Sequence, residues 1–137
     1  MFNDIDAAEE WLNTWTASVN AQAERAAQLT SRVAALTANA QSADGSIKVT
    51  VGSTGQIEKL SLDDRVQRLS GEELSRQILG VMRKAQASLS TLVTAEVAAT
   101  VGVDTETGRA VIGSFETRFP QPADDDRDGR GGEHRGR

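Results

Sequence analysis

The amino-acid sequence predicts an α+β protein in which two long helices accompany an antiparallel β-hairpin. Three observations lead to this fold class. Residues 4–42 contain no glycine or proline, residues 47–62 alternate apolar and polar side chains around a glycine turn, and residues 71–101 present one broad apolar face. Aromatic residues make up only 4% of the chain. The core is therefore expected to consist of aliphatic side chains, which suits helices better than a large β-sandwich.

The first predicted helix spans residues 4–42. Apolar side chains recur there in steps of four and three, interrupted only by Gln22. They are Ala8, Leu12, Trp15, Val19, Ala26, Leu29, Val33, Leu36 and Ala40. Such a helix would be roughly 55 Å long, which exceeds the width of a globule of this size. We therefore expect it to project and to need a partner helix, from either a second copy of the chain or the second helix of the same chain.

The beginning of this helix is acidic and contains both tryptophans. Residues 1–24 include five acids and no base, so this part should repel the phosphates of a nucleic acid. Trp11 and Trp15 lie one helical turn apart. Their rings could stack on bases, but beside Leu12 they fit the apolar seam of the helix better.

The hairpin follows a break in the helix at residues 43–46. Residues 47–51 alternate strictly, residues 52–55 form a turn with two glycines, and a second strand runs from near Gln56 to Leu62. One face of the hairpin is apolar and consists of Ile47, Val49, Val51, Leu60 and Leu62. A two-stranded hairpin is not stable alone. We therefore predict that these five side chains form the core or a dimer contact.

The second long helix is predicted over residues 71–101. Ser70 and Glu73 have the spacing of a capping box at its start. Its apolar face consists of Leu74, Ile78, Val81, Met82, Ala85, Leu89, Leu92 and Val93. Gly80 is expected to mark a close crossing, and Gly102 to end the helix. For residues 103–119 we favour a short helix over an extended segment.

Composition excludes most enzyme classes. The chain has no cysteine, and its one histidine is His134 in a polar C-terminal stretch. A Ser–His–Asp triad and a histidine or thiolate metal site therefore cannot be assembled. We expect no catalytic residue, metal, cofactor or small-molecule substrate. The start lacks the pattern of a secretory signal, and no apolar run is long enough to span a bilayer. A cytoplasmic protein without a membrane contact is expected.

The domain organisation predicted from composition is simple. Residues 1–119 form one small domain, and residues 120–137 form a disordered polar tail that has no aliphatic residue larger than alanine.

Three segments and one further residue together resemble the YbaB/EbfC family of bacterial nucleoid-associated proteins. They are Gly45–Val51, Gly55–Asp63, Glu73–Leu79 and Ala85, and the resemblance covers about residues 15–100. It implies an α+β fold with a short antiparallel sheet between two helices. It also implies a homodimer with projecting helices that binds double-stranded DNA with weak sequence selectivity, and so organises DNA or modulates transcription in the nucleoid.

Basic residues identify candidate DNA contacts, although the net charge is −5. Arg25 and Arg32 share one face of the first helix, and residues 65–84 contain five bases against two acids. The predicted DNA-binding residues are Arg25, Arg32, Arg65, Arg68, Arg76, Arg83 and Lys84. The alternative for each of them is a solvated side chain or a pair with a nearby glutamate.

A second function on the same fold is a protein-interaction module. The acidic first half of the first helix, with its apolar seam, would then dock a partner protein, and DNA would not be a ligand. Relatives of this fold beside actinobacterial type VII secretion systems are consistent with this function, as is the Ala- and Arg-rich, Lys-poor composition, which suits a high-GC bacterium. The two functions differ in whether the bases of residues 65–84 form one continuous surface.

Overall fold

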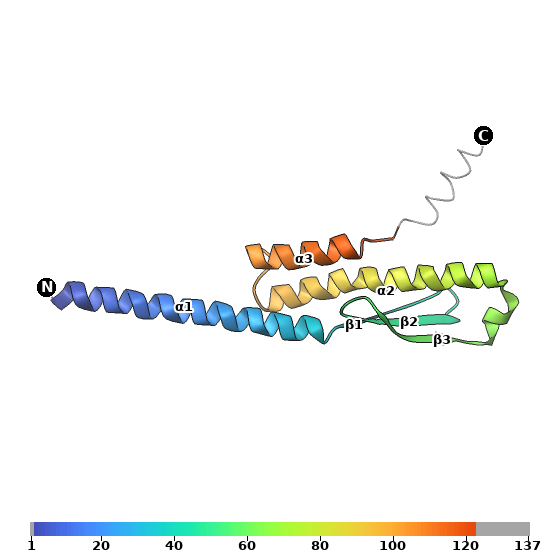
Figure 1. Ribbon diagram of the computed structural model, residues 1–137, viewed down its shortest axis with the longest axis horizontal. Coiled ribbons are helices and arrows are strands. Elements are labelled where there is room, and N and C mark those ends of the chain that lie inside the picture. Colours follow the sequence, from blue (N-terminus) through green and yellow to red (C-terminus); the bar gives the residue numbers. More distant parts are fainter. Residues whose placement is uncertain (1, 123–137) are drawn as a thin grey trace, which may run out of the picture.

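The computed structural model describes residues 2–122 and confirms the α+β fold (Figure 1). In chain order the elements are α1 (Phe2–Ala34), β1 (Thr37–Gln41), β2 (Ile47–Gly52), β3 (Ile57–Leu62), the 3₁₀ helix η1 (Asp64–Arg68), α2 (Gly71–Ala99) and α3 (Glu106–Arg118). Of the predicted polar tail, residues 123–137 lie outside the described part of the chain.

The core lies between the three-stranded sheet and α2. The strands are antiparallel in the order β1-β2-β3, and α2 packs on β1 and β2. The alternation of β2 turns Ile47, Val49 and Val51 toward α2, where they are fully buried. They meet Leu89 and Val93 of α2 in the aliphatic core that the composition predicts.

The prediction that the first helix continues to residue 42 is wrong. The helix ends at Ala34, and residues 37–41 form β1, a strand that the sequence analysis missed. Within β1, Ala38 is buried and pairs with Val51. Alanine favours a helix, but the hydrogen bonds and burial gained along β2 outweigh that preference. Leu36 and Ala40 therefore leave the helical seam.

The expectation that the first helix projects is confirmed. Leu29 and Val33 of α1 pack against the core, whereas residues 5–20 are all exposed. The helix has 33 residues, so it is about 50 Å long, and its N-terminal half extends beyond the sheet and α2 (Figure 1).

The second long helix forms as predicted and ends at Ala99, with Thr100 as its C-cap. The Ser70 hydroxyl accepts a hydrogen bond of 3.0 Å from the backbone N–H of Glu73. Gly102 adopts a positive φ of 93° just beyond the helix. The expected close crossing at Gly80 is wrong for the described chain, because a Cβ added there would meet nothing within 4 Å.

The helix favoured for residues 103–119 is present as α3. It packs on α2 through Phe115, which is buried. Thr105 caps its start by accepting a hydrogen bond of 3.0 Å from the backbone N–H of Gly108. A Cβ at Gly108 would lie 2.1 Å from the carbonyl oxygen of Gly102. Only glycine therefore allows the α2–α3 connection to lie this close to α3.

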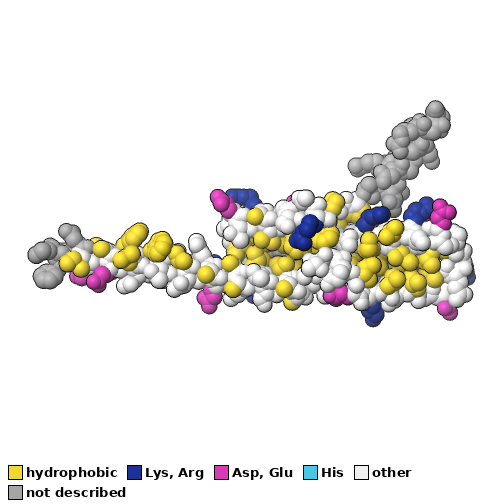
Figure 2. Space-filling model, in the orientation of Figure 1, with side chains coloured by type: hydrophobic (Ala, Val, Ile, Leu, Met, Phe, Trp, Pro, Cys, Tyr) yellow, Lys and Arg dark blue, Asp and Glu magenta, His cyan; other side chains and the backbone are white. Residues whose placement is uncertain are grey.

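Three of the five side chains on the apolar face of the hairpin are buried in the core, and two remain partly exposed. Leu60 and Leu62 pair with Val49 and Ile47 and so share the core face of the sheet. Both nevertheless remain 43–44% exposed. Ile57 of β3 and Leu79 of α2 are exposed to the same extent. We call these four residues the β3 patch, and Figure 2 shows hydrophobic side chains gathered over α2 and the sheet.

Candidate nucleic-acid interface

A groove along one flank of α2 brings three of the predicted DNA-binding residues together. Its volume is about 590 Å³, and it is lined by Ser42, Ala43, Glu73, Arg76, Gln77, Gly80, Val81, Arg83 and Lys84. Two turns of α2, about 10 Å, separate Arg76 from Arg83. Gly80 lies between them without a side chain, so it leaves the floor of the groove open.

The groove is basic because three bases and one acid line it. Among the lining residues, all of them described, Glu73 is the one acid. Its carboxylate contacts the Arg76 guanidinium and accepts a hydrogen bond of 2.9 Å from Gln77. Arg76 keeps 72% of its side chain exposed, and Arg83 and Lys84 are exposed as well. The guanidinium groups and the ammonium group can therefore reach an anion in solution.

A further base that the sequence analysis missed lies beside this groove. Arg83 also lines a second hollow together with Arg118 of α3. The Arg118 guanidinium lies 4.5 Å from the ring centre of Phe115 and 5.5 Å from that of Phe119, so the two rings hold it in place. In the sequence, Arg118 is a base in the last turn of the short helix favoured for residues 103–119. The basic residues considered as DNA contacts extended only to residue 84, so Arg118 was not among them.

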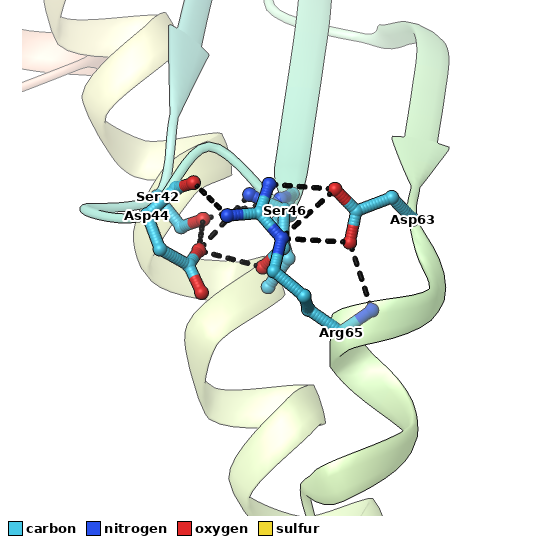
Figure 3. Close-up of polar contacts among 6 residues, drawn as sticks. Ser42, Asp44, Ser46, Asp63 and Arg65 are labelled. Atoms are coloured by element: carbon cyan, nitrogen blue, oxygen red, sulfur yellow. Dashed lines mark hydrogen bonds and ion pairs between the residues drawn. The ribbon is translucent and has the colours of Figure 1, made fainter.

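Arg65 binds residues of two neighbouring turns (Figure 3). Its Nη2 lies 2.6 Å from Oδ2 of Asp63, and its Nη1 donates a hydrogen bond of 2.6 Å to the carbonyl oxygen of Asp44. Arg65 thereby joins the β1–β2 turn to the end of β3. A side chain held in this way has fewer donors left for a phosphate than Arg83 has.

The carboxylates of this network have lowered pKa values. Hydrogen bonds from the backbone N–H and the hydroxyl of Ser46, at 2.9 and 2.7 Å, and from Ser42 lower the pKa of Asp44 from 3.8 to about 2. Hydrogen bonds from Arg65 lower the pKa of Asp63. Both shifts stabilise the fold where the carboxylates are ionised.

We expect Asp44→Asn to lose less stability than the wild type as the pH falls from about 4 toward 2. Because the folded pKa lies below the unfolded one, the contribution of Asp44 is fully present above about pH 4 and is lost as the pH falls toward 2. Thermal melting between pH 7 and pH 2 measures this. Glu10→Gln, in the exposed part of α1, is the control and should keep the wild-type profile. An unchanged acid limb in Asp44→Asn would contradict the assignment.

The remaining predicted contacts lie outside the groove. Arg32 lies 3.4 Å from Glu96. Arg25 lines a separate hollow with Glu106 at the α2–α3 connection, and Arg68 lies in the last turn of η1. The structure therefore brings Arg76, Arg83 and Lys84 together and places Arg25, Arg32, Arg65 and Arg68 elsewhere.

Nowhere in residues 2–122 do three or more histidine, cysteine, aspartate or glutamate side chains gather as a metal ion would require. Among the helices of that same range, none has the length and apolar character needed to cross a membrane.

Comparison with known protein families identifies a match. The profile of the YbaB/EbfC DNA-binding family matches residues 9–103, which include the groove. No curated protein and no solved structure matches the chain.

Proposed function

Since the chain belongs to the YbaB/EbfC DNA-binding family, we propose that it binds duplex DNA as a homodimer with weak sequence selectivity. The family is non-catalytic, and membership implies a nucleoid-associated DNA-binding protein. Organising DNA or modulating transcription in the nucleoid is the role that we propose for this chain.

The basic groove on α2 is the observation that supports this proposal most strongly. Arg76, Arg83 and Lys84 lie along one flank of α2, and the one acid among the lining residues, Glu73, contacts Arg76 and leaves Arg83 and Lys84 unopposed there. Exposed guanidinium and ammonium groups neutralise phosphates. Contacts to phosphate contain no sequence information, so binding through this groove would be weakly selective. Arg118 extends the basic surface, and Arg25, Arg32, Arg65 and Arg68 remain secondary candidates.

Salt dependence tests the DNA proposal. A fluorescently labelled random-sequence duplex is titrated with the protein, and anisotropy is read at about 50 and 200 mM salt. We expect affinity to fall by a factor of about 10³ or more for a dimer with six or more phosphate contacts, because each contact releases counterions. Absence of binding at 50 mM salt would refute the proposal and leave the protein-interaction function on this fold.

The β3 patch is the surface that we propose for the homodimer. Ile57, Leu60 and Leu62 stay 43–44% exposed on β3, a strand at the edge of the sheet, and Leu79 of α2 is exposed to the same extent. An edge strand with exposed apolar side chains is ready to pair with another chain. Pairing across it would bury the patch and double the number of basic grooves.

We expect light scattering to give twice the 14.6 kDa mass of the chain. Leu60→Arg places a charge in the patch and should yield a monomer with unchanged helical content. Lys59→Ala is the matched control, because it alters the neighbouring side chain on the opposite face of β3. A wild-type monomer, or a Leu60→Arg protein that remains a dimer, would show that the patch is not the interface.

A further inference from the structure

The described part of the chain ends against α2, beside the bases of the proposed DNA site. The Phe119 ring lies so close to the β2–β3 turn that a Cβ at Gly55 would collide with it. The side-chain amide of Gln121 then donates a hydrogen bond of 3.3 Å to the carbonyl oxygen of Ala87 in α2. These contacts hold the residues before Pro122 on the surface of the domain.

Pro122 lies at a basic hollow, which we call the Arg118 hollow. Its volume is about 290 Å³, and Arg83 and Gln86 of α2 line it together with residues 118–122. Arg83 also lines the groove that contains Lys84, so the hollow and the groove share a base. Within residues 5–122, no carboxylate forms an ion pair with Arg83, Lys84 or Arg118. These three exposed bases can therefore bind an acidic segment.

The sequence that follows Pro122 supplies such a segment. Residues 123–128 read Ala-Asp-Asp-Asp-Arg-Asp, with four acids and one base. Asp124 and Asp126 come two and four residues after Pro122, so the chain allows them distances of at most about 7 and 14 Å from it. The Debye length is about 8 Å at physiological salt. Carboxylates tethered this closely stay within the field of the bases, at an effective concentration on the order of millimolar.

We propose that residues 123–128 dock on the Arg118 hollow and the adjoining end of the basic groove of the same chain. Their aspartates would form ion pairs with Arg83, Lys84 and Arg118. The segment would then occupy bases that the proposed function assigns to DNA, so it would compete with a duplex for them. The competition rests on the proposed function, whereas the contact itself does not.

Two other segments of the chain fit this surface less well. Asp6, Glu9 and Glu10 belong to the half of α1 that projects away from the sheet and α2 (Figure 1), so only a second copy of the chain could bring them to the groove. Residues 129–137 contain three arginines and one acid. They therefore carry the same sign of charge as the groove and do not complement it.

Zero-length cross-linking tests the contact in the full-length protein without DNA. A carbodiimide activates a carboxylate, and an amine in contact with it forms an amide while the reagent leaves as a urea that has taken up the water. The chain has three lysines. Lys84 lines the groove, whereas Lys48 and Lys59 line a hollow on the face of the sheet away from α2. At 50 mM salt we expect residues 124–126 to be joined to Lys84 about tenfold more often than to Lys48 or Lys59, as measured by mass spectrometry.

Salt and charge reversal show whether attraction between charges, and not the tether alone, produces this cross-link. Raising the salt concentration to about 500 mM should lower the yield about tenfold, because exposed ion pairs are screened. Arg83→Glu with Arg118→Glu should lower it as far at 50 mM salt, although Lys84 and the tether are unchanged. Arg25→Glu with Arg32→Glu changes the net charge equally and should keep the wild-type yield.

The competition is measured by anisotropy with the labelled duplex. Replacing the three aspartates of residues 124–126 with asparagine should raise DNA affinity about tenfold at 50 mM salt, as expected when the segment occupies the bases in about nine of ten molecules. Saturating duplex should also remove the Lys84 cross-link from the wild type. The matched control, Asp6→Asn with Glu9→Gln and Glu10→Gln, removes three charges from α1 and should raise affinity by less than about twofold.

Several results would overturn the inference. A Lys84 cross-link that is absent, that is no more abundant than those to Lys48 and Lys59, or that survives both high salt and the arginine variant would show that the segment does not dock. A product found only at twice the chain mass on a denaturing gel would place the acids of another copy on the groove. Unchanged DNA affinity in the aspartate variant, or an equal gain in the α1 control, would refute the competition. If no variant binds DNA, the proposed function fails, and the cross-link still decides whether the segment docks.

Discussion

Replacing Arg76 and Arg83 together with glutamate is expected to reduce DNA affinity by about a hundredfold or more at 50 mM salt. Both side chains line the groove on α2 and are exposed, so the substitution places carboxylates where phosphates would bind. Affinity should also depend less steeply on salt, with a slope smaller by about one unit for each phosphate that the variant no longer neutralises. Fluorescence anisotropy with a random duplex at several salt concentrations measures both effects.

The chain offers a matched control for this pair. Arg25 and Arg32 are also seven residues apart on one helix, so Arg25→Glu with Arg32→Glu changes the net charge by the same amount. Because these residues lie outside the groove, DNA affinity should fall much less. If the α1 pair had the larger effect, the DNA contact would lie on the projecting helix and the groove would not be the site. Circular dichroism should show both variants folded.

Leu89→Ala is expected to destabilise the fold by about 2–5 kcal/mol. Leu89 is fully buried in the α2 face of the core, among residues of the sheet and the other helices. Truncation removes its packing interactions and leaves a cavity, because a close-packed core relaxes only in part. The melting temperature should fall by roughly 10 °C or more for a domain of this size.

Leu12→Ala is the control for that change, since it removes the same atoms from a leucine that is 51% exposed. Its effect on the free energy of unfolding should lie within about 0.5 kcal/mol. The wild type and both variants are melted at the same protein concentration, so that concentration does not affect the comparison. An equal loss of stability in the two variants would mean that Leu12 is buried in solution.

The sequence predicted the elements whose signals are local. The capping box at Ser70, the alternation of residues 47–51 and the glycine turn each depend on neighbours within a few residues, and each is present in the structure. Strand β1 was missed because residues 37–41 are short and rich in alanine. What makes them a strand is pairing with β2, an interaction that no helical or strand period within those residues reveals.

The candidate site was predictable in composition but not in geometry. Counting bases in residues 65–84 identified Arg76, Arg83 and Lys84, which one flank of α2 does bring together. The same count included Arg65, whose guanidinium is engaged by Asp63 and by the Asp44 carbonyl across a turn. It left out Arg118, because this residue is distant from residues 65–84 in the sequence and comes near them only through the packing of α3 on α2.

The projecting half of α1 is expected to unfold locally more easily than the rest of the described chain. Residues 5–20 are exposed on all sides, so each helical turn there is held by its own backbone hydrogen bonds and by little else. Such a segment can unwind and reform locally at a small cost in free energy while the core stays folded. Its amide hydrogens should exchange with solvent long before those of α2. A glutamate-specific protease that cuts after Glu9 or Glu10 would then shorten the helix and leave the domain intact.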